Sequence, residues 1–178
     1  MNENTKSIVV LTVICLVVAI CLAGVNYVTA PIIEEANAKA AFDACFEVMP
    51  EGTDFETVEQ LPEGLPGTIT SVFREKTGKG YAFKLTTKGY DTGLVIVCGI
   101  DANGAITGTK IVSSNETPSI GGRCAGEDYA GQYVGKTASL DGVQAISGAT
   151  YTSTGYKNAV LDAFAAFEAL QKGGSSNG

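Results

Sequence analysis

The sequence of 178 residues contains no histidine and no tryptophan, and its five cysteines form no C-x-x-C pair. The absence of histidine removes the commonest ligand of zinc and haem and the commonest general base. The cysteines offer no substitute, because two lie in an apolar run and three are widely separated: Cys15, Cys21, Cys45, Cys98 and Cys124. We therefore expect no metal centre and no catalysis that depends on histidine.

Positive charge is also scarce. Twelve Lys and Arg residues stand against nineteen Asp and Glu residues, which gives a formal net charge of −7. A protein that binds nucleic acid needs a basic patch to neutralise phosphates. The sequence has no basic cluster, so nucleic acid is not expected as a partner.

A long apolar run lies near the N-terminus. No charged side chain occurs from Ser7 to Ile33, and Ile8 to Val25 is apolar apart from Thr12 and Gly24. About 20 such residues are enough to cross a bilayer as a helix. The run therefore predicts a single transmembrane helix that anchors the protein in the cell membrane.

A cleaved signal peptide is the alternative interpretation. Val28-Thr29-Ala30 has the small-residue pattern of a cleavage site, but Pro31 follows it and the apolar run exceeds a usual signal sequence. We therefore favour a retained anchor. Lys6 and Lys39 nearly balance across the span, so the positive-inside rule only slightly favours a cytoplasmic N-terminus and an extracytoplasmic domain.

Four segments follow from the composition along the chain. Residues 1–30 form the N-terminal tail and transmembrane helix, and residues 31–66 form a helical stalk and connector in which Pro31 should start a new turn or a kink. Residues 67–172 form the folded domain. Residues 173–178 form a flexible tail.

Alternating or continuous apolar residues predict strands at 68–75, 81–85, 93–100 and 105–112. The short turns between them favour an antiparallel meander over β-α-β units. Residues 115–134 should be loop or short helix, and residues 155–171 an amphipathic helix. The predicted fold class is α+β: a single N-terminal transmembrane helix, then an extracytoplasmic domain with a mainly antiparallel sheet flanked by helices.

A short hydroxyl-rich segment, Ser147-Gly148-Ala149-Thr150-Tyr151-Thr152-Ser153, precedes the last predicted helix. Small side chains let a ligand approach the backbone, and a helix start offers unpaired N–H groups and a positive dipole end. These features suit a phosphate. They also suit an ordinary strand–turn–helix junction, because Ser and Thr are common N-cap residues.

A second segment, Asn115-Glu116-Thr117-Pro118-Ser119-Ile120-Gly121, follows the last predicted strand. It combines a carboxylate, a hydroxyl, a proline-fixed turn and a glycine, which together can form the rim of a site for a planar polar ligand. Taken alone, Glu116 is better explained as a solvated turn residue.

Several motifs occur in the same order as in the FMN-binding domain family, which this chain resembles. They are Gly80-Tyr81-Ala82-Phe83, Lys88-Gly89-Tyr90, Gly99-Ile100-Asp101, Asn103-Gly104, Glu116-Thr117-Pro118-Ser119-Ile120-Gly121 and the segment 147–153. With its single span and its length, the whole chain also resembles the G subunits of Rnf complexes, which are ion-pumping ferredoxin:NAD oxidoreductases. The C subunits of the sodium-pumping NADH:quinone reductase share the motifs but are usually longer.

This resemblance implies that FMN is joined covalently, through a phosphoester, to Thr150. It also implies that a separate flavin transferase makes the bond from FAD outside the cytoplasm. The sequence places no histidine or cysteine nearby to activate the hydroxyl, which argues against self-attachment. Thr152 and Ser153 are the rival acceptors. The expected cofactor-binding residues are Thr150, Ser147, Gly148, Ala149, Tyr151, Thr152, Glu116, Thr117, Ile120 and Gly121.

The role implied by the resemblance is electron relay between the other membrane and peripheral subunits of an ion-translocating oxidoreductase. No complete activity is then expected from this chain alone. Three alternatives remain open: a stand-alone extracytoplasmic flavinylated electron carrier, a C subunit of the sodium-pumping NADH:quinone reductase, and an anchored non-enzymatic domain that binds a different anionic ligand.

The chain departs from the family pattern at two places. Gln144 occupies a position that is often acidic in the family, so a transferase that reads that acid would flavinylate this chain less efficiently. Ser114 replaces a frequent histidine, and Ser119-Ile120-Gly121 replaces a frequent Gly-Leu-Gly. Neither change removes the acceptor hydroxyl.

Overall fold

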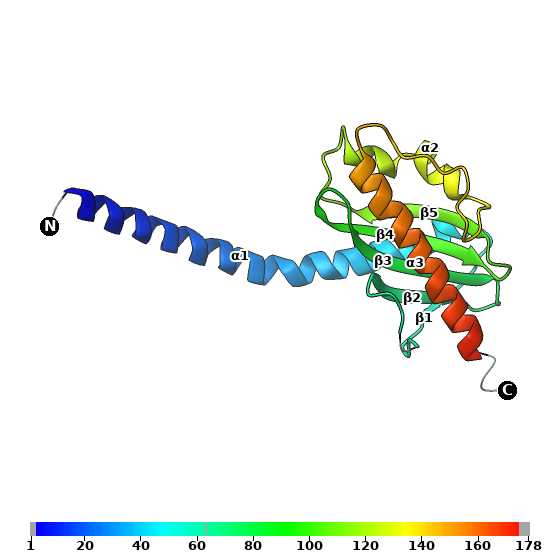
Figure 1. Ribbon diagram of the computed structural model, residues 1–178. Helices are drawn as coiled ribbons and strands as arrows, with labels where there is room; N and C mark the ends of the chain where they lie inside the picture. Colours follow the sequence, from blue (N-terminus) through cyan, green and yellow to red (C-terminus); the bar gives the residue numbers. More distant parts are fainter. Residues whose placement is uncertain (1–2, 63, 175–178) are drawn as a thin grey trace. The chain divides into compact units, whose positions relative to one another are not determined.

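The computed structural model describes residues 3–62 and 64–174 and divides into two compact units, Met1–Lys39 and Ala40–Gly178 (Figure 1). The longest helix, α1 (Glu3–Val48), contributes residues to both units. The division falls inside the predicted stalk. Residues 175–178 of the predicted tail lie outside the described residues.

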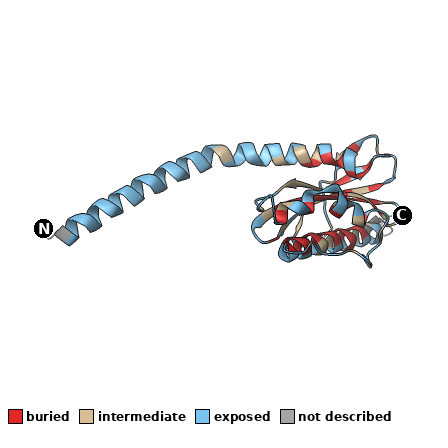
Figure 2. Ribbon diagram, turned by 90° about the horizontal axis from the view of Figure 1, so that it is seen from above, coloured by how far each residue is buried: buried red, intermediate tan, exposed pale blue. Residues whose placement is uncertain are grey.

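The N-terminal unit is the first part of α1. Its side chains from Asn4 to Val28 are exposed (Figure 2), although most of them are apolar. By length and composition, this helix is able to cross a membrane, as the sequence predicted. Pro31 lies inside α1 and does not start a new helix. Proline removes only one backbone donor, and here the turns on both sides of it remain helical.

The second unit contains a five-stranded sheet. Its strands follow the order of the sequence, and every neighbouring pair is antiparallel: β1 (Phe55–Thr57), β2 (Ile69–Glu75), β3 (Gly80–Lys88), β4 (Thr92–Asp101) and β5 (Ile106–Ser113). The predicted antiparallel meander is confirmed. β1 lies in the segment that the sequence indicated as a connector, because three residues are too few to show a periodicity of two.

Both faces of the sheet are covered within this unit. Leu94, Ile96 and Cys98 of β4 belong to one buried cluster together with helix α3 (Thr150–Gly174). Val97 belongs to a second cluster, together with Ala41, Ala44, Cys45 and Val48 of α1. Successive side chains of a strand point to opposite faces, so β4 needs apolar residues at both parities. This explains its continuous apolar run.

Helix α3 is longer than the helix predicted at 155–171, because it begins at Thr150 and includes Gly155. A Cβ at Gly155 would overlap the carbonyl of Lys88, so a residue that usually weakens a helix is needed here for close packing. Between β5 and α3, the predicted short helices are present as η1 (Gly121–Ala125), α2 (Glu127–Ala130) and η2 (Gly131–Tyr133).

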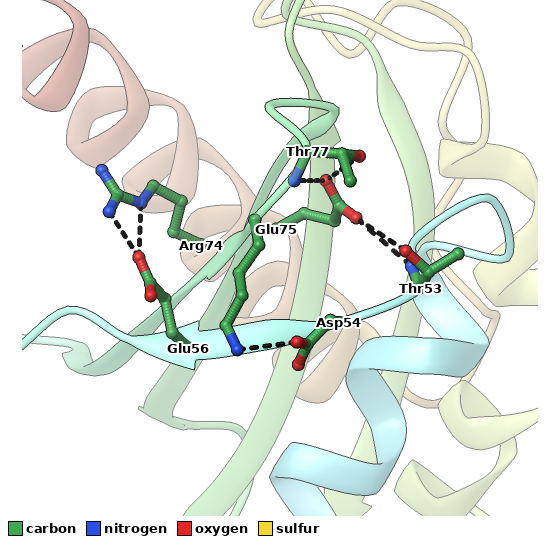
Figure 3. Close-up of polar contacts among 7 residues, drawn as sticks. Thr53, Asp54, Glu56, Arg74, Glu75 and Thr77 are labelled. Carbon is green, nitrogen blue, oxygen red and sulfur yellow. Dashed lines mark hydrogen bonds and ion pairs between the residues drawn. The ribbon is translucent and has the colours of Figure 1, made fainter.

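Glu75, at the end of β2, is the one fully buried carboxylate among the described residues. Its Oε2 accepts hydrogen bonds from the hydroxyl and N–H of Thr77, at 2.6 and 2.7 Å, and from the N–H of Lys79 at 3.2 Å. Its Oε1 accepts from the N–H of Thr53 at 3.3 Å (Figure 3). The Thr77 hydroxyl bond contributes most to lowering the pKa of Glu75 to about 2. The carboxylate thus fixes the turn after β2 to the loop after α1.

Candidate functional site

The hydroxyl-rich segment forms a turn followed by the first turn of α3. The N–H of Ala149 donates to the carbonyl of Ile146 at 2.9 Å, and Gly148 between them has a φ of +84°, which favours glycine. The N–H of Ser153 donates to the carbonyl of Ala149 at 2.9 Å, which is the first helical bond. The N–H groups of residues 150–152 therefore precede any intrahelical acceptor and remain available to a ligand.

The hydroxyl groups of this segment differ sharply in their surroundings. Thr152 is 1% exposed and donates to Oε2 of Glu116 at 2.9 Å. Ser153 is 2% exposed, and its Oγ accepts from the N–H of Ile146 at 3.1 Å. Thr150 is exposed, and no group among the described residues hydrogen-bonds to its hydroxyl. Of these three, only the Thr150 hydroxyl is both accessible and uncommitted.

Glu116 connects three segments that are far apart in the sequence. It follows β5, its Oε2 receives the Thr152 hydroxyl from α3, and its Oε1 accepts from the N–H of Asp91 between β3 and β4 at 3.1 Å. A Cβ at Gly121 would overlap both the Glu116 carboxylate and the Thr152 hydroxyl. Glycine at this position therefore leaves the space that the carboxylate occupies. The solvated-turn interpretation of Glu116 does not describe this environment.

A cavity of about 480 Å³ lies over this cluster, within the usual range of roughly 300–1,000 Å³ for small-molecule sites. It is lined by Tyr90, Glu116, Thr117, Ile120, Gly121, Gly148, Ala149, Tyr151 and Thr152. Two of the residues predicted from the sequence do not line it. The Ser147 carbonyl accepts a hydrogen bond from Arg123 at 3.4 Å, and Thr150 lies in a neighbouring cavity.

This neighbouring cavity has a volume of about 390 Å³ and is lined by Lys88, Gly89, Thr150, Tyr151, Thr154, Gly155 and Asn158. Only Tyr151 lines both cavities. The sequence therefore identified eight of the nine residues that line the larger cavity, whereas Thr154 and Asn158 of the smaller one carried no separate signal.

Tyr90 is a site residue that the sequence interpretation did not select. It is 77% exposed and makes an edge-to-face contact with Tyr151, which is 74% exposed, with ring centroids 6.3 Å apart. Large exposed aromatic side chains expose much apolar surface to water unless a ligand or partner covers them. The signal available in the sequence was the Lys88-Gly89-Tyr90 motif itself.

These features fit a flavin mononucleotide. The larger cavity offers aromatic and apolar surface from Tyr90, Tyr151 and Ile120 for a planar ring, and polar contacts from Glu116 and Thr117. The first turn of a 25-residue helix supplies free N–H groups and a positive dipole end for a phosphate. The donor set and the dimensions thus agree with the ligand that the sequence resemblance implies.

Two buried tyrosines, Tyr129 and Tyr133, form a hydrogen-bonded pair next to the first turn of α3. The Tyr129 hydroxyl lies 3.1 Å from the carbonyl of Ser153 and 2.9 Å from the Tyr133 hydroxyl. Burial raises the pKa of Tyr129, so its hydroxyl stays protonated and can donate to the Ser153 carbonyl.

Burial also raises the pKa of the Cys98 thiol to about 12, which keeps that cysteine unreactive.

The Glu116–Thr152 hydrogen bond can be measured with a double-mutant cycle. We expect Glu116→Ala and Thr152→Val each to lower the free energy of unfolding of the full chain in detergent. The double variant should lose about 1 kcal/mol less than the sum, because either single change already breaks the bond. Strictly additive losses in urea titrations would show that the two side chains do not interact in solution.

Gln144, where the family pattern is often acidic, has an exposed side chain, and its backbone is held by another residue. Its N–H donates to Oε1 of Gln132 at 2.8 Å. The side chain is thus free to meet an external protein and is not needed for the fold of the loop.

The chain is similar in sequence to several known proteins. Residues 89–165 match the FMN-binding domain family. The chain is 33% identical to the G subunit of the Na(+)-translocating ferredoxin:NAD(+) oxidoreductase complex of Acetobacterium woodii, over 92% of this chain and 91% of that protein. It is 30% identical to the G subunit of the ion-translocating oxidoreductase complex of Methanosarcina acetivorans, over 91% of both chains. The G subunit of the proton-translocating ferredoxin:NAD(+) oxidoreductase complex of Clostridium ljungdahlii is 25% identical over 86% of this chain and 85% of that protein.

Proposed function

Because the chain belongs to the family of G subunits of ion-translocating ferredoxin:NAD oxidoreductase complexes, we propose that it is a membrane-anchored electron-transfer subunit whose FMN is joined covalently to Thr150. One observation carries the choice of attachment point. The Thr150 hydroxyl is exposed at the start of α3, whereas the hydroxyls of Thr152 and Ser153 are buried in internal hydrogen bonds.

The chain's own residues bind and orient the cofactor. Tyr90 and Tyr151 line the larger cavity and would contact the ring system, and Glu116 holds the first turn of α3 in place through Thr152. The bound FMN supplies the redox chemistry. Covalent attachment keeps the cofactor on an exposed site in every redox state. No side chain of this chain needs to act as an acid or a base.

The attachment requires a separate flavin transferase that uses FAD. A threonine hydroxyl is a weak nucleophile, and the residues lining its cavity include no histidine or cysteine that could activate it. In the family that this chain resembles, the transferase acts outside the cytoplasm. The N-terminus is then cytoplasmic, α1 crosses the membrane, and the domain is extracytoplasmic.

Electron transfer within the complex requires the other membrane and peripheral subunits. Affinity purification of the full chain from gently solubilised membranes should therefore recover further redox subunits in constant proportion. A chain that is repeatedly purified with its flavin but without any other redox subunit would contradict membership of a complex. That result would favour the stand-alone flavinylated carrier.

A further inference from the structure

We propose that the smaller cavity is the phosphate subsite of the attached flavin and that Lys88 is its counter-charge. This inference rests on the proposed attachment of FMN to Thr150. It assigns a binding role to Lys88 and Thr154, which line the cavity together with Thr150.

The position of the acceptor directs the phosphate to this side. The phosphorus atom is bonded directly to Oγ1 of Thr150, so its free oxygens must lie within two bonds of that atom. Thr150 lines the smaller cavity and does not line the larger one. The phosphate is therefore adjacent to the smaller cavity, whereas the ring can reach the larger cavity past Tyr151, which borders both.

Charge supports the same assignment. The phosphodiester carries one negative charge, and the only ionisable acid or base lining the larger cavity, apart from tyrosine, is Glu116. A carboxylate disfavours a second anion close to it. The only such group lining the smaller cavity is Lys88, which is exposed and makes no ion pair among the described residues. The two cavities thus separate the anionic and cationic groups of the site.

The backbone also positions these groups together. Thr150, Thr154 and Asn158 are spaced four residues apart on α3 and therefore lie on one face of the helix. Lys88 is the last residue of β3, and its carbonyl lies so close to Gly155 that a Cβ there would overlap it. Lys88 of β3 and the three polar residues of α3 therefore line the same cavity from two elements.

The covalent step balances without any change of oxidation state. Oγ1 of Thr150 forms a bond to the phosphorus of the FMN half of FAD. The bond from that phosphorus to the oxygen shared with the AMP half breaks, and AMP leaves. The hydroxyl proton passes to the transferase or to water. In this step Lys88 stabilises the phosphate by charge and does not exchange a proton.

Lysine acylation of the full chain tests the subsite, with the membrane protein kept in detergent. The chain is compared before and after incubation with flavin transferase, Mg²⁺ and FAD, and each lysine is followed by peptide mass mapping. We expect attachment of FMN to slow acylation of Lys88 severalfold, because its ammonium becomes paired and covered. Acylation of Lys172, at the far end of α3, should not change.

Variants give a second measurement. Lys88→Gln should slow the attachment of FMN by about tenfold, a factor equivalent to about 1.4 kcal/mol. Lys88→Arg should restore most of the rate, and Lys172→Gln, with the same change in charge, should leave it unchanged. Equal acylation of Lys88 before and after attachment, or an unchanged rate in Lys88→Gln, would overturn the subsite. Absence of any flavin mass on the Thr150 peptide of the parent chain would overturn the proposed function itself.

Discussion

Thr150→Ala is expected to abolish flavin fluorescence of the denatured chain on a gel. The parent chain, produced in a host that contains the flavin transferase, should fluoresce under ultraviolet light after denaturation. Only a covalent bond survives that treatment, and the variant lacks the oxygen that forms it. The expected change is complete loss, because the hydroxyls of Thr152 and Ser153 are buried and already hydrogen-bonded.

Thr152→Val is the matched control for this experiment. It removes the rival hydroxyl two residues away and its bond to Glu116, and it should still carry covalent flavin because the Thr150 oxygen is unchanged. Thr150→Ser keeps a hydroxyl at the same position and should retain some attachment. A dark parent band from a host with the transferase would contradict the flavin proposal. Flavin mass on the peptide at Thr152, with Thr150 unmodified, would move the attachment point.

Glu75→Gln is expected to lower the free energy of unfolding by about 1.5–3 kcal/mol. The parent carboxylate accepts five hydrogen bonds from Thr53, Thr77 and Lys79 and is fully buried. Glutamine has the same size as glutamate, but its NH₂ group takes the place of one carboxylate oxygen. That group cannot accept hydrogen bonds and would face N–H and O–H donors. Urea unfolding of the full chain in detergent, followed by the near-ultraviolet circular dichroism of the tyrosines, measures the loss.

The dependence of the free energy of unfolding on pH independently measures how much the ionised Glu75 carboxylate stabilises the fold. The folded protein lowers the pKa of Glu75 from 4.5 to about 2, chiefly through the Thr77 hydroxyl, so the unfolded chain binds the proton more readily. The stabilisation is therefore fully present above pH 4.5 and is lost as the pH falls towards 2. Between these pH values, the stability of Glu75→Gln should fall less steeply than that of the parent chain.

Glu56→Gln is the control for both measurements. It makes the same change in charge nearby, in an exposed pair with Arg74 (Figure 3), and should alter stability by less than about 1 kcal/mol. If Glu75→Gln and Glu56→Gln had the same small effect at every pH, the buried carboxylate would not hold the two loops together.

The sequence predicted regular structure well because the signals for it are local. Alternating or continuous apolar residues identified β2 to β5, and the uncharged run from Ser7 to Ile33 identified the helix able to cross a membrane. The start of α3 was predicted five residues too late. Glycine and hydroxyl residues usually indicate a loop, and close packing of Gly155 against β3 outweighs that local preference.

The sequence by itself determined the fold class and the segments that form the site, because periodicity and motif order reside in neighbouring residues. Only the tertiary structure decided which hydroxyl is free. Thr150 and Thr152 are alike in sequence, but Thr152 faces Glu116, which lies 36 residues away, and Thr150 faces the cavity of Lys88. Burial and charge at a site depend on such distant contacts, which no local pattern of residues specifies.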